Sequence, residues 1–370
     1  MNDADYMQLA IDLAEKGLYT ASPNPRVGCI IVRNGQIIGR GYHVRTGQAH
    51  AEVNAIADAG NVEDATVYVT LEPCSHTGRT PPCSDALITA NVARVVVAMA
   101  DPNPLVAGSG IAKLEQAGIV VELGLLASQA RQLNPGYIKR MELGLPWVRV
   151  KLAMSLDGRT AMASGESQWI TGKRARSDVQ QLRARSCVVM SGVNTIIADD
   201  ASLTVRADEL GLEAGLAKEA AEQQPVRVVL DSNLRLPTTA KILSQPGRLI
   251  IMTAVENSVA EQALVAMGAE VVHCGNKNGQ VDLDNVLQFL AEMSVNEILV
   301  EAGATLSGAL AEAGLVDHYT VYMAPTLLGN TARPLLQLPL ATMAEQQRLQ
   351  IDSIEPIGED WRIDSRPVRK

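Results

Sequence analysis

Two successive series of alternating strand and helix patterns constrain the fold of this chain more strongly than any other feature. The first series occupies about the first 125 residues, and the second begins after Pro146. A polar helical stretch, Ser128–Glu142, leads to Gly144-Leu145-Pro146, a sequence typical of a break between domains. The length of 370 residues is also two to three times that of a usual domain. We therefore predict two α/β domains, residues 1–145 and residues 146–370.

The first series predicts an α/β sandwich whose later strands are joined by helices. Its clearest local signal is Asn34-Gly35 between two apolar runs, which indicates a tight β-hairpin. We expect a helix at Asp3–Lys16, helices that start near His50, Cys83 and Gly110, and strands at Val27–Arg33, Gln36–Tyr42, Thr66–Leu71, Arg94–Ala100 and Ile119–Leu123.

The second series predicts a largely parallel sheet, because its strands alternate with helices. The stretch Ala207–Gln224, rich in Ala, Glu and Leu, is interpreted as a solvated helical insertion. We expect helices at Lys173–Arg185 and Thr305–Ala313, and strands at Trp147–Ala153, Cys187–Ser191, Val226–Asp231, Leu249–Thr253, Val271–Cys274, Glu297–Glu301 and, closing the series, His318–Ala324.

Charge and hydropathy restrict the class of function. A net charge of −9 argues against broad nucleic-acid contact, since such binding draws its affinity from Lys and Arg that neutralise phosphates. The chain has no run of about 18 apolar residues that could span a membrane. Its first residues include two acids and no apolar targeting segment, and its five cysteines do not form an even set for disulfides. These features favour a cytoplasmic enzyme that acts on small molecules.

Four residues of the first domain fit the chemistry of a hydrolytic zinc site. Such a site needs nitrogen or thiolate ligands, an open position for water, and a carboxylate that moves protons. The zinc deaminase signature is His-x-Glu followed by Pro-Cys and a second Cys, in which Glu is not a ligand. His50-Ala51-Glu52 and Pro73-Cys74 match it. We predict that His50, Cys74 and Cys83 bind Zn²⁺ and that Glu52 is the catalytic proton shuttle.

The spacing of the two cysteines departs from that signature. Eight residues separate Cys74 from Cys83, whereas the common signature has two between its cysteines. A longer loop can still bring both thiolates to one metal ion, so the spacing indicates a subfamily. His76, inside this loop, is a competing ligand, and we prefer it as a loop residue near the substrate. The alternative is that both cysteines are incidental thiols.

The same loop carries a resemblance to a known family. The sequence CSHTGRTPPC from Cys74, together with PNPRVG from Pro23 and DPNP from Asp101, resembles the bifunctional deaminase/reductase of riboflavin biosynthesis. The resemblance continues in order through KLAMSLDGRTA from Lys151, SQWITG from Ser167 and VEAGATLSGAL from Val300. It implies a cytidine-deaminase-like α/β/α sandwich followed by an α/β domain similar in fold to dihydrofolate reductases.

This resemblance also implies two consecutive reactions. In the family, the first domain hydrolyses the 2-amino group of a 2,5-diamino-6-(phosphoribosylamino)pyrimidinone and releases ammonia. The second domain uses NADPH to reduce the ribosyl group to ribityl. By the same resemblance, Asn24 and Asp101 contact the substrate of the first domain, although each would otherwise be an ordinary turn residue.

In the second domain, the resemblance assigns residues to the cofactor and to the substrate. Those implied to contact NADPH are Ala153, Trp169, Thr195, Asp199, Ser232, Gly303, Ala304, Thr305, Leu306, Ser307, Gly308 and Ala309. Those implied to contact the substrate are Ser167, Arg183, Leu203, Arg206 and Glu301.

Residue chemistry alone leaves several of these assignments open. The turn at Gly303 precedes a helix, so its backbone N–H groups could hold a phosphate, or it could be a simple strand-to-helix turn. The guanidinium groups of Arg183 and Arg206 match phosphate geometry, but an isolated arginine is more often a surface residue. Lys151 and Asp199 are candidate polar groups beside the nicotinamide, with Lys151 the catalytic one. Lys151 could equally be a strand residue paired with an acid.

Two rival functions fit parts of the sequence. A nucleic-acid editing deaminase with a C-terminal binding module would need a basic groove, which the acidic balance disfavours. A deaminase fused to a purely structural second domain that supports oligomers would not bind a cofactor. The sequence does not determine the oligomeric state, and a homo-oligomer is compatible with it.

Overall fold

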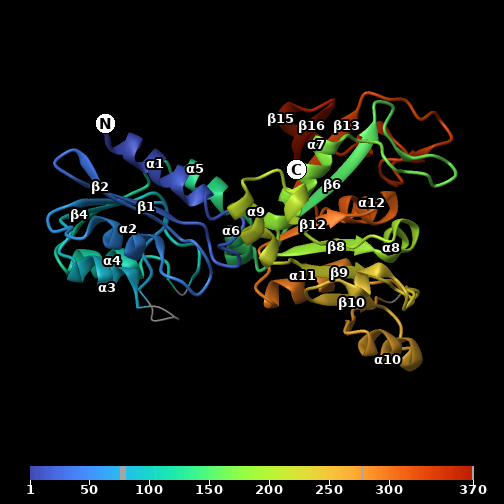
Figure 1. The fold of residues 1–370 in the computed structure, drawn as a ribbon, viewed down its shortest axis with the longest axis horizontal. Helices are drawn as coiled ribbons and strands as arrows, with labels where there is room; N and C mark the ends of the chain where they lie inside the picture. The colour runs from blue at the N-terminus through green and yellow to red at the C-terminus, as the bar shows by residue number, and fades with distance from the viewer. Residues whose placement is uncertain (76–80, 105, 277, 369–370) are drawn as a thin grey trace. The chain divides into compact units, whose positions relative to one another are not determined.

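The computed structural model describes residues 1–75, 81–104, 106–276 and 278–368. The chain divides into two compact units, Met1–Leu145 and Pro146–Lys370, which are drawn in Figure 1. Across the described ranges, every helix is too short or too polar to cross a membrane.

A five-stranded sheet in the order β2-β1-β3-β4-β5 forms the centre of the first unit. Its strands are β1 (Gly28–Arg33), β2 (Gln36–Tyr42), β3 (Thr66–Val69), β4 (Arg94–Val97) and β5 (Val120–Leu123). β1 is antiparallel to β2 and β3, whereas β3, β4 and β5 run parallel. Asn34 and Gly35 both have positive φ between β1 and β2, which confirms the predicted hairpin.

Helices cover both faces of this sheet. One face packs against α1 (Asp3–Glu15), α5 (Ala127–Leu133) and α6 (Pro135–Leu143), and the other against α2 (Ala51–Ala59), α3 (Cys83–Thr89) and α4 (Ser109–Gln116). Successive residues of β1 alternate between the two cores, with Ile30 in the first and Ile31 in the second. The first unit is therefore an α/β/α sandwich, as the sequence predicts.

The predicted helical stretch at Ser128–Glu142 is confirmed, and it consists of two helices. α5 ends at Leu133 and α6 begins at Pro135. Proline has no backbone N–H and its ring clashes with the preceding turn, so it begins a helix more readily than it continues one.

Two glycines of β2 let helix α2 approach the sheet closely. A Cβ atom on Gly41 would lie 2.2 Å from the carbonyl oxygen of Ala51, and one on Gly39 would lie 2.4 Å from that of Ala55. Any side chain at either position would push α2 away from β2. The position of His50, directly before α2, therefore depends on these glycines.

The second unit contains a nine-stranded sheet in the order β11-β10-β9-β8-β12-β6-β13-β16-β15. Neighbouring strands from β11 to β13 are parallel, which confirms the predicted parallel sheet, and β16 and β15 join antiparallel. The strands are β6 (Trp147–Ser155), β8 (Val188–Gly192), β9 (Val226–Leu230), β10 (Leu249–Thr253), β11 (Glu270–His273), β12 (Glu297–Glu301), β13 (His318–Ala324), β15 (Leu349–Ile357) and β16 (Asp360–Pro367).

The remaining elements of this unit connect or cover the sheet. Its helices are α7 (Lys173–Arg185), α8 (Val193–Asp199), α9 (Ala214–Glu222), α10 (Ser258–Ala266), α11 (Leu283–Glu292) and α12 (Ala304–Glu312). A short ribbon pairs β7 (Arg159–Ala161) with β14 (Arg333–Pro334). The predicted insertion at Ala207–Gln224 is a 3-10 turn and the separate helix α9, divided at Gly211, whose φ of +66° ends the turn.

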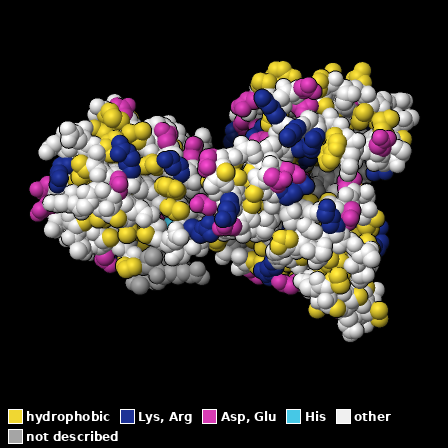
Figure 2. All heavy atoms as spheres, viewed as in Figure 1, with side chains coloured by type: hydrophobic (Ala, Val, Ile, Leu, Met, Phe, Trp, Pro, Cys, Tyr) yellow, Lys and Arg dark blue, Asp and Glu magenta, His cyan; other side chains and the backbone are white. Residues whose placement is uncertain are grey.

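The C-terminal hairpin of β15 and β16 extends the sheet beyond β13, the last strand expected from the sequence. Pro356 and the charged residues of both strands hide the strand pattern in the sequence. Large apolar side chains on this hairpin are exposed, and Figure 2 shows hydrophobic side chains along the same edge. They include Leu349, Ile351, Ile354 and Trp361.

Candidate functional site

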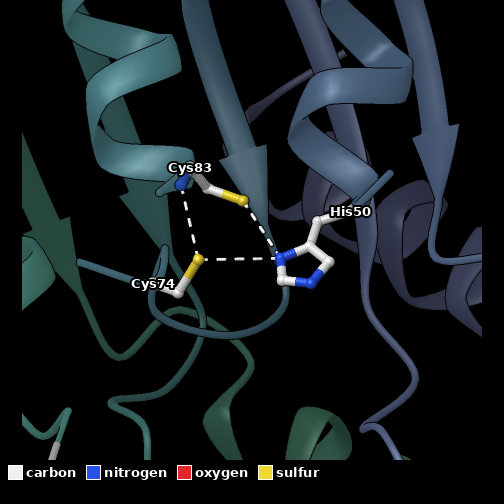
Figure 3. A group of neighbouring side chains, drawn as sticks. All are labelled: His50, Cys74 and Cys83. Carbon is white, nitrogen blue, oxygen red and sulfur yellow. Dashed lines mark hydrogen bonds between the residues drawn. The ribbon is translucent and has the colours of Figure 1, made fainter. Parts of the chain in front are cut away.

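Three potential metal ligands meet where α2 and α3 begin. His50 precedes α2, Cys83 is the first residue of α3, and Cys74 lies on the loop after β3 (Figure 3). Ligand atoms from the three side chains all lie within 4.8 Å of one another, and no other such group of His, Cys, Asp or Glu occurs among the described residues. The Nδ1 atom of His50 is 3.2 Å from the Cys83 sulfur and 3.6 Å from the Cys74 sulfur.

The start of α3 stabilises a thiolate at Cys74. The backbone N–H of Cys83 donates to the Cys74 sulfur over 3.3 Å, and both the N–H and the hydroxyl of Ser84 donate to the Cys74 carbonyl. Unpaired N–H groups at a helix start favour negative charge. The hydrogen bond with the Cys83 side chain is the largest cause; with those from the His50 ring and the Cys83 N–H, it outweighs burial and lowers the pKa of Cys74 well below its usual range.

A divalent cation would resolve the conflict between the two sulfur atoms. The interaction with Cys74 and burial raise the pKa of Cys83 far above its usual range, because adjacent thiolates repel. A cation bound by both sulfurs and by His50 removes that repulsion. Zn²⁺ favours this set of ligands, and catalytic zinc sites have three protein ligands and an open fourth position. The residues present therefore fit a catalytic zinc ion.

Glu52 lies in the first turn of α2, beside this group. Its side chain belongs to the buried interior, where it is 3% exposed. Burial is the main cause that raises its pKa to about 7, and the Cys74 thiolate adds to the effect. A carboxyl group with such a pKa can take up and release a proton near neutral pH.

His43 is a member of the site that the sequence analysis missed. Its Nδ1 atom is 3.2 Å from the carbonyl oxygen of Ala49, and its Nε2 atom is 3.1 Å from the amide nitrogen of Asn24. Because a carbonyl can only accept, Nδ1 donates and Nε2 accepts from Asn24. Burial lowers the pKa of His43 and so disfavours its charged form. The ring also lies edge-on to His50, 5.2 Å between centres, so Asn24 is brought next to the metal-ligand group.

Asp101 is held in place by its neighbours. Its carboxylate accepts hydrogen bonds of 2.9 Å from the Tyr137 hydroxyl and of 2.9 Å from the backbone N–H of Asn103. The side chain is nearly buried, at 8% exposed. His76, the competing ligand candidate, lies outside the described residues.

A second group of charges lies at one end of the parallel strands in the second unit. Glu301 ends β12 and pairs in register with Lys151 on β6. Arg183 on α7 donates to both carboxylate oxygens of Glu301, over 2.5 and 3.0 Å, and to the Thr204 carbonyl over 3.0 Å. Burial opposes ionisation of both partners, but their mutual attraction lowers the pKa of Glu301 and raises that of Arg183. Burial also lowers the pKa of Lys151.

Predicted cofactor residues lie at the start of α12, along α8 and on the loop before α7. The Gly303 N–H donates to the Thr195 hydroxyl of α8 over 3.3 Å, and Asp199 ends α8 and accepts from Ser167 over 3.5 Å. Trp169 is 69% exposed, with the Arg176 guanidinium 4.5 Å from the centre of its ring. These residues present polar groups and an aromatic face to solvent.

Other residues predicted to contact the cofactor or the substrate are buried or already bonded to other residues of the protein. Ser307 and Gly308 are buried, and a Cβ atom on Gly308 would lie 2.0 Å from the Gln337 carbonyl oxygen. The Ser232 hydroxyl accepts from the Val281 N–H over 3.1 Å. The remaining placements are a buried Leu203, an ion pair of 2.8 Å between Arg206 and Glu209, and half-buried Ala153, Ala304, Leu306 and Ala309.

The fold and the sites define the class, which is a zinc-type base deaminase joined to a reductase. Residues 1–99 match the cytidine and deoxycytidylate deaminase zinc-binding region, and residues 146–363 match the RibD C-terminal domain. These two matches correspond to the two units described above.

Full-length relatives extend this finding. The chain is 49% identical to riboflavin biosynthesis protein RibD of Escherichia coli over 97% of this chain and 98% of that protein. Its structure is similar to that of Acinetobacter baumannii RibD, with a TM-score of 0.91, 46% identity and 99% of each chain covered. A Thermotoga maritima diaminohydroxyphosphoribosylaminopyrimidine deaminase/5-amino-6-(5-phosphoribosylamino)uracil reductase has a TM-score of 0.84 and 29% identity over 99% of this chain and 98% of that one.

This chain belongs to the RibD family, the bifunctional deaminases and reductases of riboflavin biosynthesis. The resemblance drawn from its motifs is thereby confirmed.

Breaking the Arg183–Glu301 pair should destabilise the second unit. The Glu301→Gln variant leaves the Arg183 guanidinium buried without its counter-charge, and should lower the free energy of unfolding by about 3 kcal/mol or more. The double variant with Arg183→Met removes both charges and should recover much of that loss. Denaturant unfolding of the full-length protein, followed by circular dichroism, measures both effects.

The same pair predicts a dependence on pH. The fold lowers the pKa of Glu301 from its ordinary value of 4.5. The ionised pair therefore stabilises the fold fully above about pH 4.5, and this stability is lost as the pH falls through the lowered pKa. The difference in stability between wild type and Glu301→Gln should therefore shrink on acidification. A difference that stays constant from about pH 7 to about pH 3 would contradict this account of the pair.

Proposed function

We propose that the enzyme deaminates 2,5-diamino-6-(5-phosphoribosylamino)pyrimidin-4(3H)-one and then reduces the ribosyl group of the product to ribityl with NADPH. The final product is 5-amino-6-(5-phosphoribitylamino)uracil. The observation that carries the proposal is the cluster of His50, Cys74 and Cys83 beside the buried Glu52. The Thermotoga maritima relative, named for this deaminase and reductase activity, supports the choice of substrate.

In the first reaction, Glu52 moves the protons. Bound zinc supplies the Lewis acidity that makes water nucleophilic near neutral pH. Glu52 accepts a proton from the attacking water, whose oxygen bonds to C2 of the pyrimidine. It passes that proton to the ring nitrogen, then takes the second proton from the newly bound hydroxyl and gives it to the amine. The C2=O bond forms as the C2–N bond breaks, and ammonia leaves. Asn24, oriented by His43, and Asp101 contact the substrate.

In the second reaction, Lys151 supplies a proton. NADPH, when bound by the residues named below, would supply a hydride for C1′ of the ribose. The bond from C1′ to the ring oxygen breaks, and the ring oxygen takes a proton from Lys151. Burial favours release of that proton, because it lowers the pKa of the ammonium group. Glu301 keeps Arg183 in place, and the exposed Arg206, which pairs with Glu209, is assigned to the substrate phosphate.

The reductase roles rest on the remaining predicted contacts. We propose that Ala153, Trp169, Thr195, Asp199, Ser232 and the Gly303–Ala309 turn contact NADPH. Ser167, Arg183, Leu203, Arg206 and Glu301 are assigned to the substrate. The exposed face of Trp169 and the N–H groups at the start of α12 support the cofactor assignment.

The zinc ligands indicate the cellular compartment of the enzyme, and the exposed C-terminal hairpin indicates its oligomeric state. Cys74 and Cys83 bind metal as thiolates, so we expect the protein to act in the reducing cytoplasm. The apolar side chains of the β15–β16 hairpin support a homo-oligomer.

The Glu52→Gln variant tests the deaminase mechanism. The amide cannot carry protons, so ammonia release should fall by about a hundredfold or more while zinc content and NADPH-dependent reduction stay unchanged. Ammonia assay and metal analysis measure this. Glu63→Gln, an exposed residue of the same unit, is the control. Near-normal ammonia release from Glu52→Gln would refute the assigned role.

Lys151→Met tests the reductase mechanism. The variant should bind NADPH as the wild type does, yet oxidise it about a hundredfold more slowly with the deaminated intermediate. Cofactor fluorescence gives the binding constant, and absorbance follows oxidation; NADH in place of NADPH measures the cofactor preference. If the full-length wild type neither binds NADPH nor turns over, the reductase assignment fails.

A further inference from the structure

Glu72 precedes Pro73-Cys74 and buries its carboxylate against backbone amides. The residue is 3% exposed. Its Oε2 atom accepts from the N–H of Asp101 over 3.1 Å and of Gly108 over 3.0 Å, and its Oε1 atom accepts from Gly110 over 2.9 Å and Ile111 over 3.3 Å. One carboxylate thus satisfies four backbone donors of the segment that runs from the end of β4 into α4.

The carboxylate caps helix α4 from a distant part of the chain. The residue before α4 is Gly108, which has a φ of +78° and no side chain to accept from the first N–H groups. Those groups normally need a side-chain oxygen at the N-cap. Glu72 takes that place for Gly110 and Ile111, and its negative charge suits the positive end of the helix.

Further contacts join the Cys74 loop to the same helix. The hydroxyls of Ser75 and Ser109 lie 2.6 Å apart. A Cβ atom on Gly110 would lie only 1.9 Å from the Pro73 carbonyl oxygen, so the backbone around Cys74 packs directly on the start of α4. A change in this contact would move both segments.

We propose that Glu72 is a positioning residue for deamination and that it holds Asp101 at a set distance from Cys74. Glu72 lies two residues before Cys74 in the chain, and its carboxylate accepts a hydrogen bond from the backbone N–H of Asp101. The inference rests on the proposed function, in which Asp101 contacts the pyrimidine substrate. Glu72 contacts neither the substrate nor the metal in this account. Its loss should therefore affect substrate binding more than the chemical step.

The Glu72→Gln variant in the full-length, zinc-loaded protein tests this proposal. Whichever way the amide turns, its NH₂ group faces two backbone donors that need an acceptor. Glu115→Gln is the matched control, since Glu115 is an exposed residue of the same helix. Ammonia release gives KM and kcat, and metal analysis gives the zinc content. Amide hydrogen exchange across 106–116 and reduction of the deaminated intermediate are measured in parallel.

We expect KM for deamination to rise about tenfold or more in Glu72→Gln, the effect of unpairing buried hydrogen-bond donors, with a smaller change in kcat. Zinc content and reductase rate should not change. Exchange across 106–116 should accelerate, and Glu115→Gln should match the wild type. Glu72→Asp keeps the charge but is one methylene shorter, so it should give an intermediate KM.

Several results would overturn the proposal. An unchanged KM with faster exchange would make Glu72 a structural anchor only, and loss of zinc would make it a support of the metal site. If Glu72→Gln does not fold, Glu72→Asp decides, and a wild-type KM in that variant rejects the proposal. A wild type that releases no ammonia instead refutes the proposed function, and the positioning role falls with it.

Discussion

The close approach of helix α2 to strand β2 is the constraint on which the deaminase site depends. Gly39 and Gly41 leave room for the backbone of α2, and that approach places His50 and Glu52 beside the start of α3. Pro82 and Cys83 begin α3 at the same point, so two helix starts and one loop converge on a small volume. The sheet beneath supplies rigidity, because its central strands β1, β3 and β4 are buried on both faces. The chemistry of the site therefore follows from backbone packing as much as from the ligands themselves.

Two different electrostatic solutions serve the two units. In the first unit, one histidine and two cysteines meet, and the two neighbouring thiolates need a cation between them. Zinc fits this set of ligands. In the second, Arg183 and Glu301 neutralise each other in a buried pair, next to a lysine whose charge burial disfavours. Each unit has its own sheet and its own core. The two units therefore hold their charged groups in different ways, one through metal ligands and the other through a buried ion pair.

The sequence predicted features that depend on neighbouring residues or on short motifs. The hairpin at Asn34-Gly35, the parallel sheet of the second unit and the meeting of His50, Cys74 and Cys83 are of this kind. Features that depend on distant contacts were missed. His43 lies in no motif, and its importance arises only from the Asn24 amide and the His50 ring. The β15–β16 hairpin was hidden because Pro356 and the charged residues of both strands break the usual strand pattern.

The central claim is that this one chain carries out both reactions in order, the first with zinc. A coupled assay of the purified full-length protein tests it most directly, with the diaminopyrimidinone substrate, NADPH and metal analysis of the same sample. We expect about one zinc ion per chain and about one ammonia released for each NADPH oxidised. Ammonia release at the full rate from zinc-free protein, or deamination without any NADPH oxidation, would contradict it.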